Sequence, residues 1–174
     1  MSALTDFLHR NADNRGVMAT LRQGLTPATE TRAWPLLAQF NGIGRNATAR
    51  AVRTVATLFA YHPAISETGN MGDTCRALCR DDEHPWEAVD PTGKAIAPGP
   101  MSRKFGWLLA SDADEIFERA ARMVLYAKSK DVPVNYAQLE KDLAHWTDQR
   151  VRESWASSFW AVKKTDSESK EANS

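Results

Sequence analysis

The sequence has few of the residues that form disulfide frameworks or metal sites. Its 174 residues include two cysteines and four histidines. Cys75 and Cys79 lie four apart in "DTCRALCRDD", a spacing that places both on one face of a helix as small buried apolar side chains. Zinc would need more ligands, and neither His62 nor His84 has zinc-finger spacing. We therefore expect no metal site and no cofactor.

Long apolar runs are absent as well. No stretch is long and apolar enough to cross a bilayer, and the start "MSALTDFLHRNAD" lacks the pattern of a signal peptide. The hydrophobic fraction of 43% and the charged fraction of 25% are those of an ordinary soluble globular protein. We expect a cytoplasmic protein that makes no membrane contact.

Signatures of catalysis are also missing. The sequence contains no GxSxG, no HExxH and no glycine-rich phosphate loop. An enzymatic interpretation would depend on "DDEHPW", where His84 follows Asp81 and Asp82, but a solvated helix end explains this group more simply. The prediction is a protein that is not an enzyme and has no small-molecule substrate.

Helical periodicity is present in nearly every segment, whereas strand-like alternation is almost absent. The clearest helix runs from about Asn46 to Ala60 and is ended by Pro63. Residues 83–100 contain four of the eight prolines, which indicates a linker. The predicted fold is all-α, in two small helical-bundle lobes. The lobes are expected at residues 1–97 and 98–164, with a disordered tail at residues 165–174.

The charges balance over the whole chain, with 22 Lys+Arg against 22 Asp+Glu, but not along it. Residues 1–60 hold seven Lys/Arg and three Asp/Glu, whereas residues 61–100 hold three and seven. No acidic residue occurs between Glu30 and Glu67. A basic first third followed by an acidic middle indicates charged partners.

Two arginines of the basic third lack a local partner. At 100° per residue, Val52 and Val55 share the apolar face of the predicted helix, and Arg50 and Arg53 fall on the opposite side. Neither arginine has an acidic residue three or four positions away. Such a face suits an external anion such as a phosphodiester backbone. Pairing with the acidic residues 81–90 across the lobes is the rival explanation.

Two other arginines do have local partners. Arg119 follows Glu115 and Arg122 follows Glu118, both at the i,i+4 spacing of helical ion pairs. A solvated helix face is enough to explain these two pairs.

Further basic residues lie in the second half of the chain. "SRKFGW" contributes Arg103 and Lys104, and "DQRVRESW" contributes Arg150 and Arg152. The tryptophans lie at helical spacing among apolar residues and are expected in the core, so no aromatic stacking surface is predicted. The expected mode of binding is contact with the nucleic-acid backbone without base reading.

Six stretches occur in an order that resembles a known family. They are "ADNRGVMATLRQGL", "AWPLL", "VRTVATLFAYHP", "SRKFGWLLASD", "LEKDLAHW" and "RESWASSFW", and together they extend over about residues 5–160. In this order they are similar to the CasB family, the small subunit of the type I-E CRISPR surveillance complex, Cascade. Each motif is diffuse, so the resemblance depends on their co-occurrence.

The resemblance implies a non-catalytic, all-helical subunit that acts in antiviral defence. Such a subunit would form a head-to-tail homodimer within Cascade, where its basic surface holds target and displaced DNA and stabilises the R-loop. Its partners would be other Cascade subunits, crRNA and target DNA. The alternative function is a protein–protein assembly subunit of a larger complex that makes no direct nucleic-acid contact.

Basic positions that match the family's pattern supply the candidate site. Arg45 and Arg50 match less firmly than the others, and the neutral net charge departs from the more basic members of the family. No catalytic or metal-binding residue is predicted. The candidate nucleic-acid-binding residues are Arg45, Arg50, Arg53, Arg103, Lys104, Arg122, Arg150 and Arg152.

Overall fold

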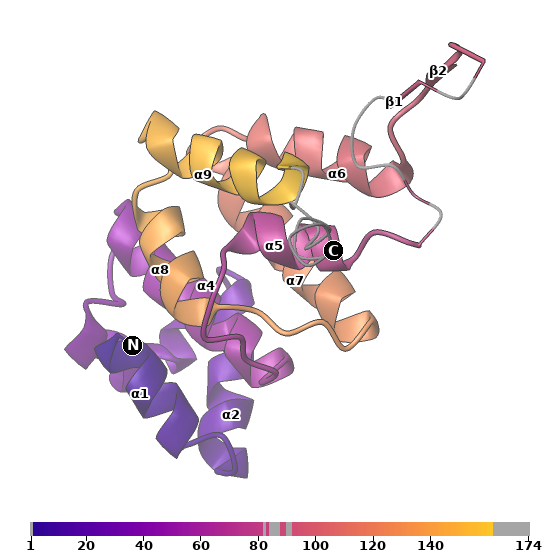
Figure 1. Cartoon of the computed structure of the whole chain (residues 1–174). Helices are drawn as coiled ribbons and strands as arrows, with labels where there is room; N and C mark the ends of the chain where they lie inside the picture. Colours follow the sequence, from indigo (N-terminus) through magenta and orange to yellow (C-terminus); the bar gives the residue numbers. More distant parts are fainter. Residues whose placement is uncertain (1, 82, 84–87, 90–91, 162–174) are drawn as a thin grey trace, which may run out of the picture.

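The fold is all-α, as predicted (Figure 1). The computed structural model describes residues 2–81, 83, 88–89 and 92–161. The α-helices are α1 (Ala3–Arg10), α2 (Arg15–Leu21), α3 (Trp34–Leu37), α4 (Ala47–Tyr61), α5 (Met71–Ala77), α6 (Pro100–Leu109), α7 (Glu115–Ser129), α8 (Tyr136–Ala144) and α9 (Gln149–Trp160). Short 3-10 helices lie between α2 and α4: η1 (Arg22–Leu25), η2 (Glu30–Arg32) and η3 (Ala38–Phe40).

Helix α4 is the centre of the fold, and its predicted bounds are confirmed to within one residue. It begins after Asn46, whose side chain accepts a hydrogen bond from the backbone N–H of Ala49. Its neighbours are α1, α2, η1, α7 and α8. Because partners lie on several sides, α4 is buried around most of its circumference rather than along one stripe.

Local capping fixes other helix starts. Asn135 caps α8 by accepting a hydrogen bond from the backbone N–H of Gln138. At the start of α7 the capping side chain is that of Asp112. Its Oδ1 accepts from the N–H groups of Glu115 and Asp114, both at 2.8 Å, and these donors hold the pKa of Asp112 below its usual value.

The helices form two groups (Figure 1). Helices α1, α2 and α8 pack around α4, whereas α5 packs against α6 and α9, and α7 contacts α4, α5 and α6. A continuous apolar cluster runs through both groups, from Leu4 in α1 to Phe159 in α9. Each group takes helices from both sides of residue 97, and the division into lobes at that residue stays a prediction.

The proline-rich segment carries a short hairpin. Strand β1 (Ala88–Val89) pairs antiparallel with β2 (Ala95–Ile96), and the pair projects away from the helices (Figure 1). Asp82, His84 and the predicted tail at residues 165–174 lie outside the described residues. Within the described ranges, no helix combines the length and the apolar character needed to span a membrane.

Candidate nucleic-acid interface

Arg53 does not face solvent, which corrects the prediction. The residue is 7% exposed, and its Nη1 donates to the backbone oxygens of Gly42 and Gly44 at 2.8 and 2.7 Å. Its Nε lies 3.5 Å from Oε2 of Glu30. Thr57, four residues further along the same face of α4, is fully buried and donates to the backbone oxygen of Leu21. The arginine therefore anchors the loop before α4.

Arg50 also has partners within the chain. Its Nη1 pairs with Oδ1 of Asp114, its Nη2 donates to the backbone oxygen of Asp114 at 3.1 Å, and its guanidinium carbon lies 4.1 Å from the ring centroid of Phe117. The prediction that Arg50 and Arg53 lack partners is wrong, because Glu30 and Asp114 approach α4 through the fold rather than along the helix. Neither of these carboxylates belongs to residues 81–90, which the rival explanation invoked.

Three other candidates are exposed but do not gather in one place. Arg45 lies in the loop before α4, Arg103 donates to the backbone oxygen of Pro98, and Arg150 pairs with Asp148 at 2.7 Å. Arg152 is half-buried beside Trp146, with its guanidinium carbon 4.9 Å from the ring centroid, and donates to the backbone oxygen of Ser111. Arg150 and Arg152 share α9, whereas Arg103 lies on α6 and Arg45 in the loop before α4, so the four positions are divided among three parts of the fold.

Lys104 and Arg122 do come together, in a groove between α6 and α7. Its volume is about 550 Å³, within the size range of ligand sites. Lys104 lies on the exposed side of α6, with Nζ 4.6 Å from the ring centroid of Tyr126. Arg122 and Glu118 are both largely exposed and form the predicted i,i+4 ion pair. The residues that line the groove are Lys104, Trp107, Leu108, Arg119, Arg122, Met123 and Tyr126.

Arg119 adds a third cation that the candidate set omitted. It pairs with Glu115 at 3.1 Å, as the i,i+4 spacing predicts, and its Nη1 donates to the backbone oxygen of Trp107 at 2.6 Å. That second interaction joins α7 to the end of α6 and holds the guanidinium at the groove. Because the partner is a backbone oxygen, no sequence pattern indicates it.

Trp107 is the other residue that the sequence analysis missed. Its side chain is 75% exposed, although all tryptophans were expected in the core. The signal was available: Trp107 lies 200° around the helix from Phe105, which is fully buried, and 40° from Arg103. An exposed indole therefore stands beside the basic side chains of α6.

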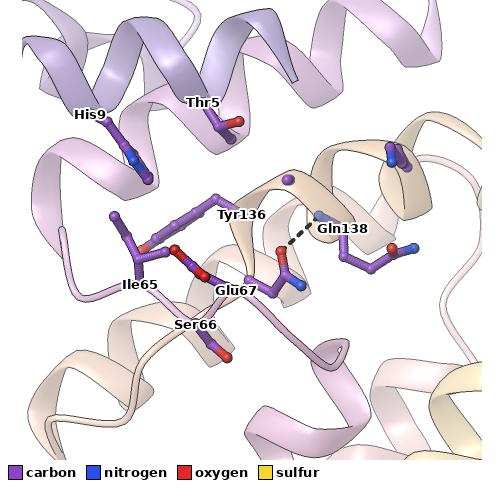
Figure 2. Close-up of a pocket in the computed structure, with 10 residues that line it drawn as sticks. Thr5, His9, Ile65, Ser66, Glu67, Tyr136 and Gln138 are labelled. Atoms are coloured by element: carbon purple, nitrogen blue, oxygen red, sulfur yellow. Dashed lines mark hydrogen bonds between the residues drawn. The ribbon is translucent and has the colours of Figure 1, made fainter. Parts of the chain in front are cut away.

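Two further hollows have mixed charge. One, of about 340 Å³, lies between α1 and the start of α8 and includes His9 and Glu67 (Figure 2). The other, of about 360 Å³, holds Arg50 and Arg53 beside three carboxylates. Groups of three or more metal-ligating side chains are absent from the part of the chain that the structure describes. The α6–α7 groove remains the best candidate for an anionic ligand.

Comparison with known proteins finds one matching family and several solved structures of similar fold. The family described as CRISPR-associated protein Cse2 matches residues 17–160. No curated protein matches the chain. Among solved structures, a Cse2-family protein from Thermus thermophilus is similar at 20% identity, with a TM-score of 0.72, over 93% of this chain and 100% of that one.

Two other solved structures share the fold. A chain of a CRISPR RNA-guided surveillance complex is 21% identical, with a TM-score of 0.69, over 90% of both chains. CasB from Thermobifida fusca is 16% identical, with a TM-score of 0.59, over 91% of this chain and 98% of that one. At these identities the likeness establishes the all-α architecture.

Proposed function

The chain belongs to the Cse2 family of CRISPR-associated proteins, and from that premise we propose that it is a non-catalytic subunit of a Cascade-type effector complex that binds nucleic-acid backbone. A chain of similar fold is part of a CRISPR RNA-guided surveillance complex, which supports assembly with other Cascade subunits. In such a cytoplasmic complex its partners are crRNA, target DNA and a second copy of the chain. Its role is to stabilise the target and displaced strands of the R-loop.

The observation that carries the proposal is the convergence of Lys104, Arg119 and Arg122 on one groove. Phosphate groups attract such cations without regard to base sequence, and binding releases counterions. Exchange of a duplex for a heteroduplex is nearly balanced in free energy, so a few backbone contacts are enough to shift it. The energetic requirement on this subunit is therefore small.

The ion pairs in the groove do not prevent phosphate binding. Arg122 and Glu118 are both exposed, and pairs of this kind contribute only a few tenths of a kcal/mol, about 0.3 to 0.5. A phosphate can replace the carboxylate at little cost because water already competes for both charges. Arg53 is excluded from the binding set by its burial, and Arg50 is held by Asp114.

A salt series of single- and double-stranded DNA binding, measured by fluorescence anisotropy, tests the proposal. The Lys104→Glu, Arg122→Glu variant is expected to weaken binding and to lower the slope of log affinity against log salt, by about 0.7 to 0.9 for each phosphate that is no longer neutralised. The matched control is Arg10→Glu, Arg15→Glu, which makes the same charge change on α1 and α2, at the far end of the molecule from α6 (Figure 1).

The alternative function is distinguished by the same experiment. If the chain is an assembly subunit without nucleic-acid contact, the wild-type protein will show no salt-dependent binding, and both reversal variants will behave as it does. Equal weakening by the two variants would indicate a general charge effect and would contradict the assignment of the groove.

A further inference from the structure

Trp107 is unusually placed for a tryptophan. It is the most exposed of the large apolar side chains that the structure describes, at 75%, whereas Trp146 and Trp155 are 2% and 0% exposed. Tryptophan is normally highly buried, because its indole gains more than most side chains on leaving water. The backbone-binding function proposed above gives this side chain no role.

The surroundings of the indole combine cations with apolar surface. Lys104 precedes Trp107 by three residues and Arg103 by four, so both are its neighbours on the surface of α6. Leu108 and Met123, which are almost fully buried, belong to the groove lining. Within the described ranges the indole has no aromatic or cationic partner, so its faces are open to a ligand.

From this arrangement we infer that an unpaired nucleotide base stacks on the indole of Trp107 while Lys104 and Arg122 bind phosphates of the same strand. The inference rests on the proposed function and specifies its ligand as single-stranded nucleic acid. Every base has a π-face, so stacking on an aromatic side chain tolerates any sequence. In a duplex those faces are covered by neighbouring bases, and only the phosphates would be available.

Charge argues against an apolar protein segment as the occupant. Three cations line the groove, and the carboxylates of Glu115 and Glu118 that pair with two of them are exposed. An apolar segment would remove water from these charged groups and offer no polar group in its place, which is costly. A strand that alternates anionic phosphates with flat bases satisfies the cations and the indole together.

Binding of two matched probes to the full chain tests the inference. The probes are a short homothymidine strand and an abasic strand of the same length, which keeps the phosphates and lacks the bases. Wild-type protein is expected to bind the abasic strand about 5- to 150-fold more weakly, the range for loss of one stacked base. Trp107→Ala should weaken homothymidine binding by a similar factor and bind both probes alike.

Controls separate stacking from folding and from charge. Trp107→Phe keeps an aromatic face and should retain most of the affinity, and Leu125→Ala removes another exposed apolar side chain, from α7, and should change nothing. Equal melting temperatures for wild type and Trp107→Ala would show that the fold is intact. The comparison of the two probes on wild-type protein needs no substitution at all.

The outcomes distinguish the two proposals. If wild type binds both probes equally, or if Trp107→Ala binds homothymidine as wild type does, stacking is refuted and backbone binding stands. If wild type binds no single strand at low salt, or if Lys104→Glu, Arg122→Glu has no effect, the proposed function and this inference both fail.

Discussion

Replacing Arg53 with alanine should destabilise the fold by about 2 to 4 kcal/mol, because it removes two hydrogen bonds from a charged donor. These bonds reach the backbone oxygens of Gly42 and Gly44, at 2.8 and 2.7 Å, and the oxygen of Gly42 is buried. The loop is pressed closely onto the fold there, since a Cβ at Gly42 would lie 2.9 Å from Cγ1 of Val52. Water therefore has little room to replace the guanidinium.

Urea denaturation, together with thermal melting, measures this effect. For a chain of this length the loss corresponds to a fall of about 5 to 15 °C in Tm. Arg53→Lys keeps the charge and a nitrogen that can donate to both oxygens, but it lacks the Nε that lies 3.5 Å from Oε2 of Glu30, so its stability should fall between those of Arg53→Ala and wild type. Arg45→Ala, which changes an exposed arginine in the same loop, should stay within about 0.5 kcal/mol of wild type. If Arg53→Ala is equally mild, the side chain lies at the surface and the reasoning is refuted.

Two further predictions concern packing and titration. Gly72→Ala should be severely destabilising, because the added Cβ would overlap the backbone oxygen of Trp155. Gly106→Ala, whose added Cβ would meet nothing within 4 Å, should instead stabilise α6 by up to about 1 kcal/mol. Equal urea midpoints for the two variants would contradict this prediction. Burial raises the pKa of Asp142, and this effect outweighs the hydrogen bonds donated by Trp155 and Gln138, which lower the pKa. The folded state therefore binds the proton of Asp142 more tightly than the unfolded state does. Wild type should therefore lose stability relative to Asp142→Asn as pH rises from about 4, the ordinary Asp pKa, and a pH-independent difference in Tm would contradict it.

The course of α4 illustrates what the sequence could and could not predict. Its bounds follow from Asn46 and Pro63, which are local signals, and these bounds are confirmed. The orientation of Arg53 was predicted wrongly because the helical pattern was interpreted as having one buried face. Helix α4 is covered on several sides by elements distant in sequence, so residues opposite the apolar stripe are buried too. Such burial depends on tertiary packing, which one helix cannot reveal.

The α6–α7 groove also shows which features depend on tertiary packing and which can be predicted from the sequence. Lys104 and Arg122 were among the candidates, and the Arg122–Glu118 pair follows from spacing alone. That α6 and α7 lie together with these faces adjoining is a tertiary fact. Trp107 was recoverable from its angle on α6, but composition alone favoured the core. Single-helix geometry thus predicts which side chains share a face, and packing decides which faces meet.

The most direct test of the central claim is target-DNA affinity of the assembled effector complex containing Lys104→Glu, Arg122→Glu subunits. We expect normal assembly, as judged by gel filtration, with weaker binding of target duplex at low salt and a shallower fall of affinity as salt rises, while Arg10→Glu, Arg15→Glu complexes bind as wild type does. Assembled complexes that bind target equally well with either variant would show that the α6–α7 groove does not hold nucleic acid.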